Sequence, residues 1–260
     1  MRLVYSDRGI GPAVVLLHAF PLSRDLWRDV VTPIADSGWR VITPDLPGFG
    51  GSRIPVESIA EMAAAVAGLL DELGVHSAVV GGCSMGGYVA LSFAEQFPER
   101  VAGLMLVDTK ASADTEEARA NRHRIAEQVE AARSTVALAR TMPEALLGPT
   151  TRAARPELVE WAQEQIITSS MVGVAAAQRA MADRSEQFDT LSRLRVPVLS
   201  IRGAEDGVST AADHAAMVAV LQDGIDVVVP ESGHLLPIEQ PGAFVGHVIP
   251  FLARVRGPHC

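Results

Sequence analysis

Residues 78–87 read Ala-Val-Val-Gly-Gly-Cys-Ser-Met-Gly-Gly, and they hold the pattern G-x-S-x-G at the end of a short apolar run. The run predicts a buried β-strand, and residues 88–96 behind it predict a helix. A serine on so sharp a strand-to-helix turn needs residues without side chains two positions before and after it. The N-terminus of the following helix favours negative charge on the serine oxygen. Ser84 is therefore the candidate nucleophile, and the alternative is a glycine-rich turn without chemistry.

Apolar runs of this kind recur along the chain. Most are apolar on successive residues, as expected for strands that are covered on both faces. Segments with helical spacing separate them, and in residues 59–73 the apolar side chains fall on one stripe. This alternation predicts an α/β fold with a mostly parallel central sheet flanked by helices. The expected strands are residues 13–17, 39–43, 78–82, 101–107, 196–201 and 226–229.

One long interval, residues 110–193, contains no visible buried strand and is rich in alanine, arginine and glutamate. Asp114 and Glu117 resemble a capping pair that opens a helix. Three prolines further along divide the interval into short helices. We therefore expect a helical cap (lid) insertion here, over an α/β core made of residues 1–109 and 194–260.

A nucleophilic serine needs a base, and the base needs an orienting acid. His234 follows the last expected strand, on the rim where parallel sheets place catalytic groups, although a loop histidine that caps the next helix is the alternative. Asp206 and Glu205 both follow the strand at 196–201, and adjacent side chains point in different directions. We expect Asp206 to be the acid and Glu205 to be a surface charge. Asp108 is a second candidate acid, but we expect it to cap the insertion that follows.

An oxyanion hole needs two backbone N–H groups near the serine. Met85, directly after the serine, supplies one, and Phe20, on the loop after the first long strand, is the natural second donor. His18 on the same loop is expected to support it by hydrogen bonding and not to act as the base. The other histidines are expected to be solvated, at helix ends or in the tail: His76, His123, His214, His247 and His259.

Taken together, these motifs resemble those of the α/β-hydrolases. The matching segments are His-Ala-Phe-Pro at 18–21, Pro-Asp-Leu-Pro-Gly-Phe-Gly-Gly-Ser at 44–52, Gly-Cys-Ser-Met-Gly-Gly at 82–87, Gly-Ala-Glu-Asp at 203–206 and Gly-His at 233–234. They follow the family's order of serine, aspartate and histidine, and they cover nearly the whole chain outside the cap. Two features depart from the family: alanine at position 19 replaces a usual glycine, and the chain starts with what looks like the family's second strand.

The resemblance implies a role for each matched residue. Ser84 is implied as nucleophile, Asp206 as acid and His234 as base, with Phe20 and Met85 as oxyanion donors. The function implied is a serine hydrolase that cleaves a carboxylic ester or a lactone through an acyl-enzyme. The chain is similar to small bacterial carboxylesterases, to 3-oxoadipate enol-lactonases and to cofactor-free perhydrolases.

Other functions on the same scaffold stay open. One alternative is a perhydrolase or a carbon–carbon bond hydrolase with the same triad, and a second is a binding protein for small molecules that lacks catalysis. The substrate contacts, for a small-molecule ester or lactone, are expected in the cap. The candidates there are apolar residues that would serve equally well as helix-packing core: Met142, Leu146, Trp161 and Ile167.

Composition excludes several classes of protein. A net charge of −9 over 260 residues, without a polybasic run, argues against nucleic acid as a partner. No dinucleotide or P-loop fingerprint and no metal-site spacing is present, so we expect no cofactor and no metal.

The serine at position 84 disfavours relatives with an aspartate nucleophile, such as dehalogenases and epoxide hydrolases. The only cysteines in the sequence, Cys83 and Cys260, are too few for a disulfide framework, which fits a reducing compartment. We see no signal peptide and no membrane segment, so we expect a cytoplasmic protein.

Overall fold

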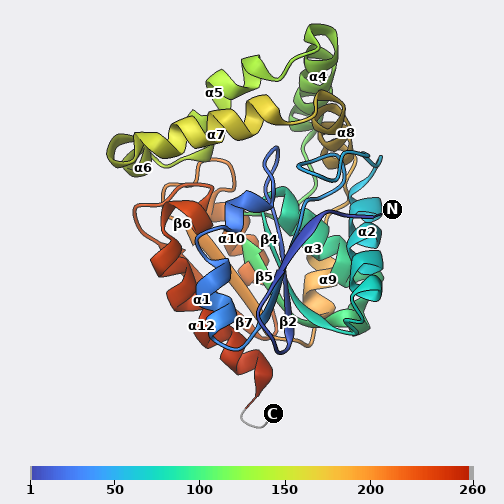
Figure 1. Cartoon of the computed structure of the whole chain (residues 1–260), viewed down its shortest axis with the longest axis vertical. Helices are drawn as coiled ribbons and strands as arrows, with labels where there is room; N and C mark the ends of the chain where they lie inside the picture. The colour runs from blue at the N-terminus through green and yellow to red at the C-terminus, as the bar shows by residue number, and fades with distance from the viewer. Residues whose placement is uncertain (1, 258–260) are drawn as a thin grey trace.

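The structure is a computed structural model that describes residues 2–257, and within them it contains one sheet of seven strands (Figure 1). The strand order is β1-β3-β2-β4-β5-β6-β7. β1 pairs antiparallel with β3, and every other neighbouring pair is parallel. The strands are β1 Tyr5–Arg8, β2 Ala13–Leu17, β3 Arg40–Pro44, β4 Ala78–Cys83, β5 Val101–Val107, β6 Val198–Gly203 and β7 Gly224–Val229.

Helices cover both faces of this sheet and one of its ends. None of the helices in the described residues is long and apolar enough to cross a membrane. The α-helices are α1 Val31–Asp36, α2 Ile59–Glu72, α3 Met85–Gln96, α4 Glu116–Ala132, α5 Val136–Leu146, α6 Pro149–Ala154, α7 Pro156–Thr168, α8 Met171–Ala182, α9 Phe188–Arg193, α10 Ala211–Val218, α11 Leu236–Glu239 and α12 Pro241–Arg256, and two 3₁₀ helices are η1 Arg24–Trp27 and η2 Pro98–Arg100.

Alternate side chains of each central strand enter two separate hydrophobic cores. In β2, Val15 and Leu17 pack with α2 and α3, whereas Val14 and Leu16 pack with α1 and α12 on the opposite face. Side chains alternate between the two faces of a strand, so a central strand with helices on both sides is apolar at every position. The continuous apolar runs of the sequence follow from this arrangement.

The expected strands are all present, with end points that shift by at most two residues. The pattern did not include β1, which reads Tyr-Ser-Asp-Arg and is mostly exposed. β1 is an edge strand, and its pairing with β3 supplies backbone hydrogen bonds without a buried side-chain face.

Helices α4 to α8, which we call the cap below, follow β5 and lie above the upper end of the sheet in Figure 1. Helix α9 belongs to the same expected insertion but packs against α3 beside the sheet. The prediction that Asp114 opens the first of these helices is wrong. Thr115 is the N-cap of α4, and its side chain accepts a hydrogen bond from the Ala118 N–H. The Asp114 carboxylate is instead buried in ion pairs with Arg122 and Arg184.

Candidate active site

Ser84 occupies the turn between β4 and α3 in a strained conformation. Its φ is 52° and its ψ is −114°, values that L-residues rarely adopt. A Cβ at position 82 would lie 2.0 Å from the carbonyl oxygen of Gly86, and a Cβ at position 86 would lie 2.1 Å from the carbonyl oxygen of Leu17. The steric argument for glycine at both positions is thus confirmed. Ser84 itself is partly exposed, although the residues around it are buried.

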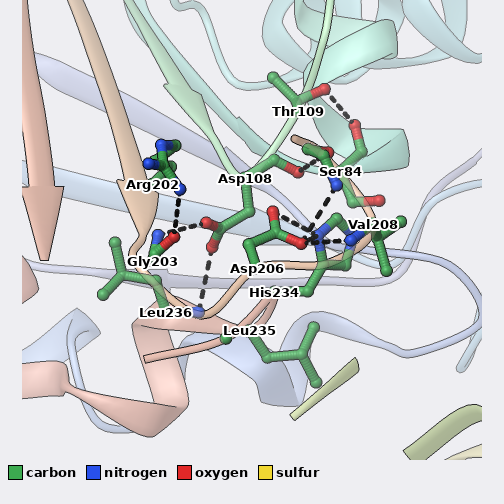
Figure 2. Close-up of polar contacts among 12 residues, drawn as sticks. Ser84, Asp108, Thr109, Arg202, Gly203, Asp206, Val208, His234, Leu235 and Leu236 are labelled. Atoms are coloured by element: carbon green, nitrogen blue, oxygen red, sulfur yellow. Dashed lines mark hydrogen bonds and ion pairs between the residues drawn. The ribbon is translucent and has the colours of Figure 1, made fainter. Parts of the chain in front are cut away.

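His234 and Asp206 form a buried pair on the loops after β7 and β6. His234 Nδ1 lies 2.9 Å from both carboxylate oxygens of Asp206 (Figure 2). Because an ionised carboxylate only accepts hydrogen bonds, Nδ1 carries the proton and Nε2 of the neutral ring is left with a lone pair. The Asp206 carboxylate also accepts the N–H groups of Val208 and Ser209, at 2.8 and 3.1 Å.

The residue before Ser84 touches the same histidine: Cys83 Sγ lies 3.6 Å from the carbonyl oxygen of His234. The loops that carry Ser84, Asp206 and His234 therefore meet at one end of the sheet, where β4, β6 and β7 finish. This is the edge at which parallel sheets assemble their sites.

The electrostatics of His234 are set by the acids around it. Burial by itself lowers the pKa of His234, but the charge and the hydrogen bond of Asp206 outweigh this effect. Asp108 and Glu239 contribute in the same direction, so the pKa of His234 is raised above its ordinary value. The protonated ring that a general base forms is thereby stabilised.

Glu205, expected to be a surface charge, is partly buried and bonded to the cap. Its carboxylate accepts the Thr150 N–H at 3.0 Å and the Thr150 hydroxyl. Glu205 and Asp206 do point in different directions, one toward α6 and the other toward His234. A carboxylate near the first turn of a helix is favoured by the helix dipole, which explains its place.

Asp108 does not cap the insertion, contrary to expectation. Its carboxylate accepts the Gly203 N–H at 2.8 Å and the Leu236 N–H at 3.1 Å, both in the core (Figure 2). Its hydrogen bonds thus go to backbone groups, whereas Asp206 bonds directly to His234. Burial first, and the charge of Asp206 next, raise the pKa of Asp108 to about 8.

Phe20 and Met85, the two residues expected to donate to an oxyanion, are both buried. Met85 is the first residue of α3, where an N–H has no partner inside the helix. Within residues 2–257 no acceptor bonds to the N–H of Phe20 or of Met85. Both N–H groups are thus available as donors, and their part in an oxyanion hole stays a prediction.

His18 supports the loop that carries Phe20, as expected. Its Nδ1 donates to the carbonyl oxygen of Ala19 at 3.0 Å, and its Nε2 accepts the Leu46 N–H at 2.9 Å. Burial lowers the pKa of His18, which keeps the ring neutral in this role. The ring joins the segment at 18–21 to the segment at 44–52, two of the motifs singled out in the sequence.

His214 is not solvated, so that expectation is wrong. It is buried on α10, where Nδ1 lies 3.2 Å from Ser200 Oγ and Nε2 contacts the carboxylate of Asp226. These partners lie on β6 and β7, and the sequence holds no short-range sign of the contact. His76 and His247 are exposed, and His259 lies outside the described residues, as does Cys260.

The four candidate substrate contacts occupy different surroundings. Leu146 is buried, and its carbonyl oxygen accepts the His234 N–H at 3.1 Å. Met142 packs against both hydrophobic cores, at their junction. Trp161 donates its indole N–H to Asp25 at 2.8 Å, and Ile167 is 50% exposed. Leu146 alone among them is bonded to a residue of the Asp206–His234 pair, and binding of substrate by any of the four stays a prediction.

Sequence reasoning missed two residues that contact this site. The Thr109 hydroxyl donates to the carbonyl oxygen of Ser84 at 2.8 Å. Glu239, at the end of α11, is 2% exposed and accepts three backbone N–H groups around His234 and the cap. A lone acid in the run Leu-Leu-Pro-Ile-Glu, soon after His234, was the available signal. No group of three or more histidine, cysteine or acidic side chains in residues 2–257 is arranged to hold a metal ion.

Comparison with known proteins gives one consistent result. The family model described as the alpha/beta hydrolase fold matches residues 12–241. Over 236 residues the chain is 28% identical to 3-oxoadipate enol-lactonase 2 of Acinetobacter baylyi, covering 90% of this chain and 85% of that protein. A solved thermophilic esterase from Thermogutta terrifontis is 38% identical, with a TM-score of 0.94 over 97% of this chain and 93% of its own. The enol-lactonase from Burkholderia xenovorans LB400 shares the fold, with 23% identity, a TM-score of 0.88 and coverage of 96% of each chain.

Proposed function

Because this chain belongs to the alpha/beta hydrolase fold family, we propose that it is a serine hydrolase that cleaves a carboxylic ester or a lactone. Ser84 is the nucleophile, His234 the base and Asp206 the orienting acid. The observation that carries the proposal is the buried pair of His234 Nδ1 and both Asp206 oxygens, beside the strained turn of Ser84. The contact of Cys83 Sγ with the carbonyl oxygen of His234 links the two at 3.6 Å. The names of the esterase and enol-lactonase relatives support the choice of ester and lactone substrates.

The first half of the reaction forms an acyl-enzyme. His234 Nε2 takes the hydroxyl proton of Ser84 while Oγ attacks the substrate carbonyl carbon. The N–H groups of Phe20 and Met85 stabilise the oxyanion, and Asp206 stabilises the protonated ring of His234. His234 then donates its proton to the leaving alkoxide as the bond between the carbonyl carbon and that oxygen breaks.

The second half releases the acid. His234 takes a proton from water, the water oxygen attacks the acyl carbon, and Ser84 leaves with the proton returned by His234. With an ester the alcohol departs before this step. With a lactone the alcohol stays attached to the acyl group, so a single hydroxy acid is released at the end.

Hydrolysis of p-nitrophenyl esters from acetate to dodecanoate tests the proposal, with wild type beside Ser84→Ala. We expect kcat/KM to fall by about 10³-fold or more in the variant, because the nucleophile is lost. Ser185→Ala, at an exposed position, is the matched control and should leave kcat/KM unchanged.

Hydrolysis that persists in Ser84→Ala would contradict the role of Ser84. A folded wild type without turnover of any ester or lactone would contradict the proposal itself. Peracid-dependent halide oxidation, loss of a dienol chromophore, or saturable binding without turnover would then identify the perhydrolase, the carbon–carbon hydrolase or the binding protein.

A further inference from the structure

Glu239 joins two segments that lie far apart in the sequence. Its Oε1 accepts the Leu235 N–H at 2.9 Å, and its Oε2 accepts the Gly233 N–H at 2.9 Å and the Gly148 N–H at 2.8 Å. Gly233 and Leu235 flank His234, whereas Gly148 lies between α5 and α6 in the cap. One buried carboxylate therefore fixes the backbone on both sides of His234 and attaches it to the cap.

Within residues 2–257 the Glu239 carboxylate forms no ion pair, and its hydrogen bonds come from three backbone N–H groups. The nearby Arg155 guanidinium donates to the backbone carbonyl oxygens of Ile238 and Glu239 and not to this carboxylate. A carboxylate that is 2% exposed needs such partners, because burial without hydrogen bonds is expensive. The three N–H groups would in turn lose their acceptor if the carboxylate were removed. Loss of these hydrogen bonds would therefore leave either a buried carboxylate or three backbone N–H groups without partners.

A second set of bonds runs between the same parts of the molecule. We call residues 146–150 the cap base and residues 233–236 the histidine loop. The carbonyl oxygen of Leu146 accepts the His234 N–H at 3.1 Å. Thr150 donates to Glu205, the neighbour of the acid Asp206. The cap base thus bonds to the histidine loop and to the loop of the acid.

We propose that Glu239 is a positioning residue for His234, and that through Gly148 it couples the cap base to the alignment of the catalytic histidine. The coupling rests on the proposed role of His234 as the base. A change in the position of the cap base, such as substrate binding beneath the cap would cause, is transmitted to His234. Glu239 itself touches no reacting atom.

Hydrogen exchange of Glu239→Gln tests the coupling without any substrate. Glutamine keeps the shape but offers one acceptor oxygen, and its NH₂ group faces an N–H that the carboxylate accepted. We expect amide exchange to accelerate by about tenfold or more in both the cap base and the histidine loop. Glu160→Gln, at an exposed position on α7, is the matched control and should change neither segment. Acceleration confined to the histidine loop would overturn the coupling.

Gly148→Ala tests the coupling from the cap side. The added Cβ would lie 2.4 Å from Glu205 Oε2 and 2.8 Å from the Gly233 nitrogen, so it forces the cap base and the histidine loop apart. Faster exchange in the histidine loop is expected, and an unchanged rate there would refute the proposal. Gly68→Ala, where a Cβ meets nothing within 4 Å, is the control. This variant carries the test if Glu239→Gln fails to fold.

Kinetics and NMR titration separate a positioning role from a merely structural one. In Glu239→Gln we expect kcat per active site to fall about tenfold or more with little change in KM, because His234 is misaligned. The pKa of His234, followed by its ring C–H signals, should decrease because a nearby negative charge is lost. An unchanged kcat and an unchanged His234 titration in an active enzyme would overturn the positioning role. A wild type without Ser84-dependent turnover would instead contradict the proposed function and leave the exchange experiments valid.

Discussion

Single residues near Ser84 are under tight steric limits. Gly82 and Gly86 lie so close to neighbouring carbonyl groups that no Cβ fits, and Ser84 has a left-handed φ. Strain of this kind persists only where the surroundings enforce it. The buried strand β4 and the helix α3 enforce it here, and they expose the hydroxyl of Ser84 at the end of the sheet.

Gly82→Ala is therefore predicted to disrupt the turn. The added Cβ would lie 2.0 Å from the Gly86 oxygen, a contact that only a backbone shift can relieve. We expect a loss of about 3 kcal/mol or more in the free energy of unfolding, measured by urea denaturation, together with loss of activity. Gly68→Ala on α2 should be neutral or stabilising, by up to about 1 kcal/mol. A Gly82→Ala protein as stable as wild type would contradict the steric argument.

The charge of Asp206 predicts the pH dependence of the reaction. Because the pKa of His234 is raised, the ring of this proposed base is neutral only above the ordinary pKa of histidine. We therefore expect kcat/KM to rise with pH through that pKa. Asp206→Asn removes the main cause that raises the pKa. We expect the acid limb of the pH profile to move to lower pH and kcat to drop by about 10⁴-fold. An acid limb at the same pH in both proteins would argue against this electrostatic role.

At the scale of elements, burial decides which strands and helices a sequence pattern reveals. The central strands show as apolar runs because both of their faces are covered, whereas β1 has no buried face and shows no pattern. The start of α4 was misplaced because Asp114 has the residue type of a cap but serves as a buried partner of two arginines. A local motif cannot distinguish these roles, since Arg184 lies beyond the end of α8.

The two residues at the start of α4 should differ in what they contribute. Thr115→Ala removes one capping hydrogen bond and should cost about 1 kcal/mol in the free energy of unfolding. Asp114→Ala leaves Arg184, whose side chain is 5% exposed, without its carboxylate and should cost about 3–5 kcal/mol. Urea denaturation of both variants checks the order. A larger loss in Thr115→Ala would show that Asp114 has the lesser role.

At the scale of the whole molecule, the sheet separates two cores and the cap bonds to the loops around one end of it. Ser169 Oγ donates to the carbonyl oxygen of Pro21, beside the expected oxyanion donor Phe20. Gly148 and Leu146 bond to Glu239 and His234 on another side of the site. The cap is thus bonded to the loops of the proposed oxyanion hole, acid and base.

The buried Asp108 predicts how the stability of the whole protein varies with pH. Its pKa rises from 3.8 in the unfolded chain to about 8 in the folded protein. Between these two pH values the carboxyl group is protonated in the folded state and ionised in the unfolded chain. Its contribution is fully present below the unfolded pKa and is lost as pH rises toward about 8. Asp108→Asn does not titrate, so the stability advantage of wild type over the variant should shrink between pH 5.5 and 8.5. A difference in urea midpoint that is constant or grows over this range would contradict the assignment.

Short segments of sequence were enough for the fold and for the turn of Ser84, because their causes are local. A strand that is buried on both faces consists of apolar residues at successive positions, so it is visible in the sequence. The glycines around Ser84 are required by contacts within the turn and with the neighbouring strand. The family membership follows from the same compact motifs in their order along the chain.

The hydrogen-bond partners of the buried acids could not be predicted from the sequence, because they come from segments that are distant along the chain. Glu205 was expected at the surface yet bonds to Thr150, and Asp108 was expected to cap the insertion yet bonds to Gly203 and Leu236. For Glu239 the sequence offered only one weak indication of burial, an acidic residue within an apolar run. A buried carboxylate needs hydrogen-bond donors. Which N–H groups lie close enough to donate depends on how the loops converge at the end of the sheet.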